Sequence, residues 1–164
     1  MRRSLLCLSL ALFGSASAAF ADSGKTIVIP EHMDRAYDEY HYAPAVRVGD
    51  MVIVSGIPAS KGATYEEKIR GMFERMKITL AAAGASMDDI VEITTFHREP
   101  KDTESFDVEF EKFRAVQSEF IKQGYPAWTA VGTTALLSKD APVEMRAVAM
   151  IGAGKKITVQ RAKP

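Results

Sequence analysis

Glu144 is the most informative candidate for chemistry in this chain, because it interrupts a largely apolar segment, residues 142–150. A carboxylate on a buried strand costs free energy unless it has a partner, and loss of solvent raises its pKa. Two other interpretations stay open on the local pattern alone. Glu144 could lie in solvent on an edge strand, or it could pair with Arg146 or Lys139.

Ser55 is a second candidate, since its hydroxyl follows an apolar segment that predicts a central strand. A hydroxyl at this position is either a ligand-binding group or an ordinary turn hydroxyl. Common catalytic motifs are missing: the chain has no Gly-x-Ser-x-Gly, no phosphate-binding Gly-rich loop, no His-Glu-x-x-His and no cysteine cluster. His32, His41 and His97 have no partners at metal-ligand spacing. We therefore expect no metal site, and we interpret His97 as a polar residue that ends a strand.

The segment that carries Ser55 predicts a β-hairpin. Residues 46–48 and 51–54 are largely apolar and flank Gly49-Asp50, a pair suited to a two-residue turn. Residues 51–54 are apolar without alternation, which indicates a strand covered on both faces. The helices of this chain can cover one face only, so the other requires a second sheet or another copy of the chain. We therefore expect an oligomer.

Two amphipathic helices and further strands position these residues. A capping box at Thr64 opens a helix over about residues 65–83. A second helix begins at Asp102 or Thr103 and ends before Gly124. The order of elements predicts an α+β fold, with two helices on one face of a mixed sheet. The remaining predictions are strands at 26–29, 90–97, 128–136 and 143–151, a connecting segment at 31–42 and weak pairing at 157–159.

The first residues predict a cleaved secretory signal. Arg2 and Arg3 precede an apolar segment, residues 5–13, and small residues follow it. This segment is shorter than the roughly 20 residues that span a bilayer, so a retained anchor is the weaker interpretation. We expect cleavage after Ala21, with Ala18 as the alternative. The protein should then be periplasmic or secreted, with no membrane association after cleavage.

The rest of the chain has the length of one domain. We divide it into an N-terminal extension (22–41), a core domain (42–152) and a basic C-terminal tail (153–164). Cys7 is the only cysteine and leaves with residues 1–21, so no disulfide is expected. Without the two N-terminal arginines the chain has 19 basic against 21 acidic residues, and we expect no nucleic-acid partner.

The order and spacing of several short motifs resemble the Rid (YjgF-like) family over roughly residues 42–151. The motifs are Tyr42-x-Pro44-Ala45-Val46-Arg47-Val48-Gly49-Asp50, Val54-Ser55-Gly56, Leu80-x-Ala82-Ala83-Gly84-Ala85-Ser86-x-Asp88-Asp89-Ile90-Val91, and a closing Pro126, Leu136 and Val143-Glu144. The resemblance implies a chorismate-mutase-like fold assembled as a homotrimer, with small-molecule sites in clefts between subunits. It also implies hydrolysis of 2-imino or 2-enamino acids to 2-keto acids and ammonia, without a cofactor or a metal.

The resemblance assigns roles to particular residues. Glu144 matches the family glutamate that helps to orient the attacking water, and Ser55 and Gly56 match a Ser-Gly pair of the site. The family arginine that binds the substrate carboxylate falls on Trp128. An indole cannot replace a bidentate guanidinium, but it offers an apolar face and one N–H to an aromatic or uncharged ligand.

Two functions stay open. The first is an exported imine or enamine deaminase, or a related hydrolase, in which Arg47 or Arg146 supplies the missing cation. The second is a non-catalytic trimeric binding protein, which lost deaminase activity because Trp128 replaces the arginine. A ribonuclease, as sometimes ascribed to relatives, ranks third because the chain is mildly acidic and exported.

Overall fold

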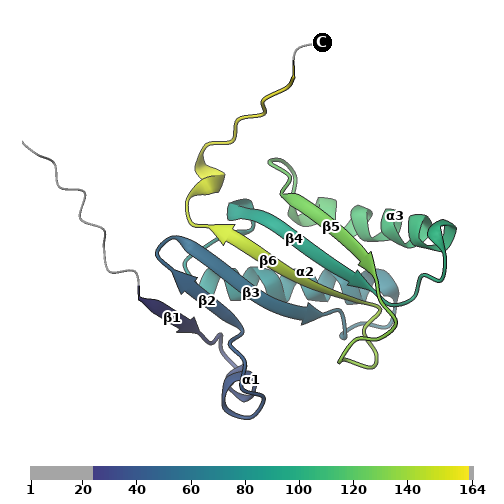
Figure 1. Ribbon diagram of the computed structural model, residues 1–164, viewed down its shortest axis with the longest axis horizontal. Coiled ribbons are helices and arrows are strands. Elements are labelled where there is room, and N and C mark those ends of the chain that lie inside the picture. Colours follow the sequence, from purple (N-terminus) through teal and green to yellow (C-terminus); the bar gives the residue numbers. More distant parts are fainter. Residues whose placement is uncertain (1–23, 163–164) are drawn as a thin grey trace, which may run out of the picture.

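The computed structural model describes residues 24–162, which form a six-stranded sheet with two long helices behind it (Figure 1). The predicted signal, residues 1–21, lies outside this range. Strand order is β1-β2-β3-β6-β4-β5, and of the five strand pairs in this part of the chain only β4–β5 is parallel. The elements are β1 Lys25–Val28, α1 Asp34–Asp38, β2 Ala45–Val48, β3 Met51–Pro58, α2 Tyr65–Ala82, η1 Met87–Asp89, β4 Ile90–His97, α3 Thr103–Phe120, β5 Ala127–Gly132, β6 Val143–Met150 and η2 Ala153–Lys155. The predicted α+β class with a mixed sheet is confirmed.

The predicted hairpin joins β2 to β3. Val48 pairs with Met51, and Gly49 adopts a φ of 59°, which suits glycine in a two-residue turn. The strand that follows β3 in the sheet is β6, which pairs with β3 on one side and β4 on the other. Glu144 on β6 therefore lies on a central strand, and the edge-strand interpretation is wrong.

The two long helices begin where the sequence predicts. The Thr64 hydroxyl accepts a hydrogen bond from the backbone N–H of Glu67. The Asp102 carboxylate accepts one from the backbone N–H of Ser105, and each pair forms a reciprocal capping box. Both helices cover the same face of the sheet (Figure 1). The buried side of α2 is largely apolar, whereas that of α3 combines Phe113 and Val116 with Glu109 and Gln117.

Three segments differ from the predictions. The connecting segment 31–42 contains the short helix α1. The predicted strand 128–136 ends at Gly132, because the N–H of Thr133 makes the last bond to β4, at 2.8 Å from the carbonyl oxygen of His97. Residues 157–159 belong to no strand.

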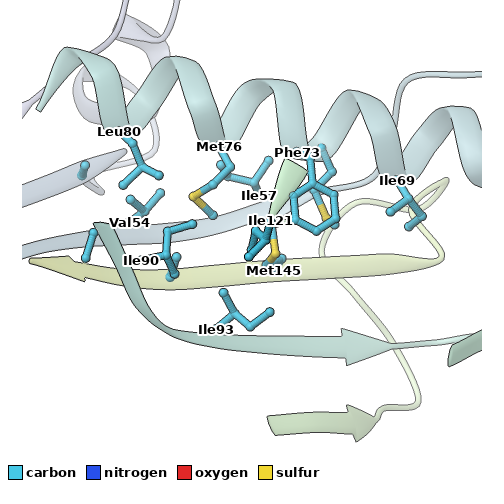
Figure 2. Packing of buried hydrophobic residues seen from close by; sticks show 14 of the residues in the cluster. Val54, Ile57, Ile69, Phe73, Met76, Leu80, Ile90, Ile93, Ile121 and Met145 are labelled. Carbon is cyan, nitrogen blue, oxygen red and sulfur yellow. The ribbon is translucent and has the colours of Figure 1, made fainter. Parts of the chain in front are cut away.

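The core lies between α2 and the sheet. Figure 2 shows α2 side chains pointing toward residues of β3, β4 and β6. Each of these side chains is at most 4% exposed, and burial of one such side chain contributes about 1.5–3 kcal/mol. They include Ile69, Phe73, Met76 and Leu80 of α2, with Val54, Ile57, Ile90, Ile93 and Met145 of the strands.

The opposite face of the sheet also carries apolar side chains. Val52 and Val54 are fully buried beneath the helices, whereas Ile53 points the other way and is 36% exposed. Met150, which pairs with Met51, is 39% exposed. Residues 51–54 thus present apolar groups on both faces, and in a single chain only one face is covered.

A hydrogen-bonded network lies on the helix side, between β4, β5 and α3. The fully buried His97 bonds through Nδ1 to Glu109 Oε1 at 2.7 Å and through Nε2 to Thr95 Oγ1 at 2.9 Å. Thr95 Oγ1 also accepts the indole N–H of Trp128 at 3.0 Å. The Tyr65 hydroxyl donates to Glu109 at 3.2 Å, and burial beside that carboxylate raises the pKa of Tyr65, which keeps the phenol protonated as a donor.

We predict that Thr95→Val lowers the free energy of unfolding by about 1–3 kcal/mol, because the indole N–H and the imidazole Nε2 each lose a partner in the protein interior. Denaturant unfolding followed by circular dichroism measures the change. Thr94→Val is the matched control, since Thr94 is adjacent on β4 and points to the opposite face. A loss equal in both variants would show that the network does not stabilise the fold.

Candidate functional site

A pocket of about 870 Å³ lies beside the end of β3 and the start of β6. The segment that follows α1 and the loop that follows β5 complete its walls. The lining residues are Tyr40, Tyr42, Ser55, Gly56, Pro58, Leu137, Ser138 and Glu144. The structure therefore brings together Glu144, Ser55 and Gly56, three of the residues that the sequence predicts for the site.

A β-bulge positions these three residues. The β3–β6 register shifts between Val54, which pairs with Ala147, and Ile57, which pairs with Met145, so β3 has one extra residue there. That irregularity spans Ser55 and Gly56. A bulge bends its strand and redirects the adjacent side chains. Here it leaves the backbone of Gly56 against the side chain of Glu144.

Gly56 is required for this close approach. A Cβ added at Gly56 would lie 2.8 Å from Cδ of Glu144 and closer still to Oε1. Any larger residue would therefore displace the carboxylate. The reason for glycine at this position is space for a neighbouring side chain, since Gly56 is not among the glycines with positive φ.

The environment of Glu144 disfavours its charged form. Its neighbours across the two strand pairs are Pro58 and Phe96, and burial raises the pKa of its carboxyl. Within residues 24–162, no hydrogen bond or ion pair engages this carboxylate. Arg146, the predicted alternative partner, instead bonds Glu92 at 3.1 Å. Glu144 thus remains available to a ligand or a water molecule.

Ser55 ties the pocket to the segment before β2. Its hydroxyl donates to the carbonyl oxygen of Ala43 at 2.7 Å, and its backbone N–H donates to that of Pro44 at 3.0 Å. The hydroxyl oxygen retains lone pairs that can accept a hydrogen bond from a ligand.

The two tyrosines of the pocket were not predicted as site residues. The backbone N–H of Tyr40 donates to the Arg35 carbonyl at 3.1 Å, and that of Tyr42 donates to Ala36 at 3.0 Å. Arg35 also donates to the Tyr40 hydroxyl at 3.1 Å, with its Cζ 5.6 Å from the ring centroid. The aromatic density of residues 37–42 was the available signal, but it did not show which part of the sheet this segment contacts.

The other predicted site residues do not line the pocket. Arg47 donates to the carbonyl oxygens of Gly49 at 2.8 Å and Ala83 at 3.2 Å, so it joins the hairpin turn to the end of α2. The Trp128 indole stacks on Phe110 at 4.6 Å between ring centroids and lies on the helix side of the sheet. The structure does not bring Trp128 together with Glu144, and the ligand-binding roles of Trp128, Arg47 and Arg146 stay predictions.

In the part of the chain that the structure describes, no three His, Cys, Asp or Glu side chains are grouped to hold a metal ion. In the same part, no helix has the length and apolar character needed to cross a bilayer. The lining residues of the pocket supply one carboxylate, hydroxyl groups and aromatic rings.

Comparison with known proteins supports the fold. The chain is 35% identical over 133 residues to the RutC family protein YjgH of Escherichia coli K12, covering 77% of this chain and 95% of that protein. It is 32% identical over 117 residues to a 2-iminobutanoate/2-iminopropanoate deaminase of Dermatophagoides farinae, covering 67% and 85%. A solved structure of protein YjgH has a TM-score of 0.65 at 34% identity, covering 77% of this chain and 96% of that one.

The match to a family extends over most of the described fold. Residues 33–151 match the family described as Endoribonuclease L-PSP, and this range includes Ser55, Gly56 and Glu144. The chain therefore belongs to the Endoribonuclease L-PSP family, which is the YjgF or Rid family.

Proposed function

We propose that this protein is an exported hydrolase of imines or their enamine tautomers, in which Glu144 orients and deprotonates a water molecule. The observation that carries the proposal is the convergence of Glu144, Ser55 and Gly56 on one pocket, where the carboxylate is half-buried. One relative is named as a 2-iminobutanoate/2-iminopropanoate deaminase, and this name supports hydrolysis of the same type of bond.

The proposed reaction needs one group that moves protons. Water held by the Glu144 carboxylate attacks the imine carbon, so a C–O bond forms while the C=N π pair moves to nitrogen. Glu144 accepts a proton from water and delivers it to that nitrogen. The carbinolamine then loses its hydroxyl proton to nitrogen through Glu144, and ammonia leaves as the carbonyl forms. A base with a raised pKa suits this exchange near neutral pH.

Glu144→Gln should abolish hydrolysis and increase stability at neutral pH. The amide cannot accept the water proton, so the rate above the spontaneous reaction should fall at least a hundredfold. Because the folded pKa of Glu144 is raised, the folded state holds a proton more tightly than the unfolded state. Stability of the wild type should therefore decrease as pH rises from the unfolded pKa through the folded pKa, and the Gln variant should not show this decrease.

Ammonia release and denaturant unfolding, each measured across pH, check both parts. Wild-type activity should rise with pH through a midpoint above that of an ordinary glutamate. Gly56→Ala is the matched second variant: it keeps the carboxylate but displaces it, so it should lose activity without the gain in stability. Full activity in Glu144→Gln would eliminate the role assigned to this residue.

We also propose that the protein forms a homotrimer whose neighbouring subunits cover the apolar outer face of the sheet. Ile53→Glu should then yield monomers, because a charge would be buried in the interface. Light scattering at micromolar concentration measures the mass. Ile78→Glu is the control, since Ile78 is 57% exposed on α2. A monomeric wild type would contradict the proposed trimer.

Export is proposed from the N-terminal pattern alone. Mass spectrometry of protein recovered from a periplasmic fraction should find Asp22 as the first residue. Recovery with Met1 or Arg2 retained would contradict the proposed cleavage.

A non-catalytic binding protein is the second candidate function. It is favoured by one observation: no lysine or arginine is among the lining residues of the pocket in the described part of the chain. A wild type that binds small molecules in this pocket but accelerates the hydrolysis of no imine would support it over the first candidate.

A further inference from the structure

The charge of the pocket points to a class of ligand. Among the lining residues within 24–162, Glu144 is the only acidic side chain, and no lysine, arginine or histidine is present. Tyr40 and Tyr42 supply two aromatic rings, which are 62% and 43% exposed. The described residues therefore offer a carboxylate and π faces, both of which attract positive charge.

Three arginines near these walls are paired with carboxylates, and Lys139, which follows Ser138, is exposed and is not among the lining residues. Arg146 bonds Glu92 on the outer sheet face at 3.1 Å. Arg98, which donates to the Lys139 carbonyl beside Ser138, forms an ion pair with Glu99 at 2.7 Å.

Arg35 contacts the Tyr40 ring but forms an ion pair with Glu39 at 2.9 Å. Because that pair is exposed, with side-chain accessibilities of 71% and 53%, solvent screens its charge. A ligand carboxylate in the pocket would thus meet the Glu144 carboxylate without a counter-ion supplied by these residues.

We propose that this pocket binds ligands with a protonated or neutral nitrogen group on an aromatic or apolar body, and that it disfavours ligands that carry a carboxylate. The nitrogen group would lie against Glu144 and the body against Tyr40 and Tyr42. The proposal deepens the proposed function, since its substrates would be imines without an acid group. It rests on that function only for the assumption that the Glu144 pocket is the ligand site.

Calorimetric titration with three probes of nearly equal shape tests the charge preference. Benzylammonium is cationic, benzyl alcohol is neutral and benzoate is anionic at pH 7.5. The cation should bind at least tenfold more tightly than the alcohol, and benzoate at least tenfold more weakly. Equal affinities, absence of binding by all three probes, or tighter binding of benzoate would overturn the proposal.

Variants locate the effect in this pocket. Glu144→Gln should reduce the affinity for benzylammonium to that for benzyl alcohol, whereas Glu74→Gln, the same change at an exposed position of α2 outside the pocket, should leave both affinities unaltered. Tyr42→Leu should lower the affinity for benzylammonium at least threefold, and Tyr42→Phe, which keeps the ring, should retain the wild-type affinity. A preference for the cation that survives Glu144→Gln would contradict the assignment.

A turnover measurement separates this proposal from the hydrolase function. The substrates are the imine of acetophenone and 2-imino-3-phenylpropanoate, each generated in situ, and ammonia release is compared with the spontaneous rate. Faster hydrolysis of the carboxylate-bearing imine would overturn the ligand class while leaving the hydrolase proposal intact. The predicted binding pattern without turnover of either imine would support the ligand class and reject the hydrolase.

Discussion

The antiparallel pairing of β3 with β6, with one extra residue at Ser55–Gly56, is the interaction on which both the core and the candidate site depend. Before the bulge, the Val54–Ala147 pair lies beneath the helices. Beyond it, Glu144 is placed against the glycine backbone. Because side chains alternate between sheet faces, a strand without the extra residue would change which face each later side chain occupies. The bulge therefore keeps the apolar side chains of β3 in the core on both sides of it and also leaves room for the Glu144 carboxylate.

The buried polar network and the candidate site lie on opposite faces of this sheet. The helix side holds fully buried apolar side chains and the network of Thr95, His97 and Glu109, in which the polar side chains have partners. The other face holds Glu144, whose burial is unfavourable to its charge. A desolvated carboxylate without a partner destabilises the fold. The apolar packing beneath the helices offsets this cost. Trp128 belongs to the stabilising side, where its indole is held by Thr95 and Phe110.

Much of the fold follows from local patterns, because caps, turns and periodicity are local properties of the chain. Thr64, Gly49 and the helical stripes indicated elements that the structure confirms. What the sequence could not provide depends on contacts between distant segments. Glu109 occurs among charged residues of α3 and resembles a surface position, yet the ring of His97, twelve residues earlier, makes its burial favourable. Tyr40 likewise reaches the pocket only through the folding of α1.

The open sheet face connects the electrostatics of the pocket to assembly. Ile53 and Met150 expose apolar area on the face that also carries Glu144, and Leu137 at the pocket wall is 98% exposed. A neighbouring copy that covered this face would remove water from around the carboxylate. Desolvation would raise the pKa of Glu144 further, whereas an arriving ligand cation would lower it again. Assembly would thus have two opposing effects on cation binding: charge pairing gains energy as the local dielectric constant falls, whereas removing both charges from water costs free energy.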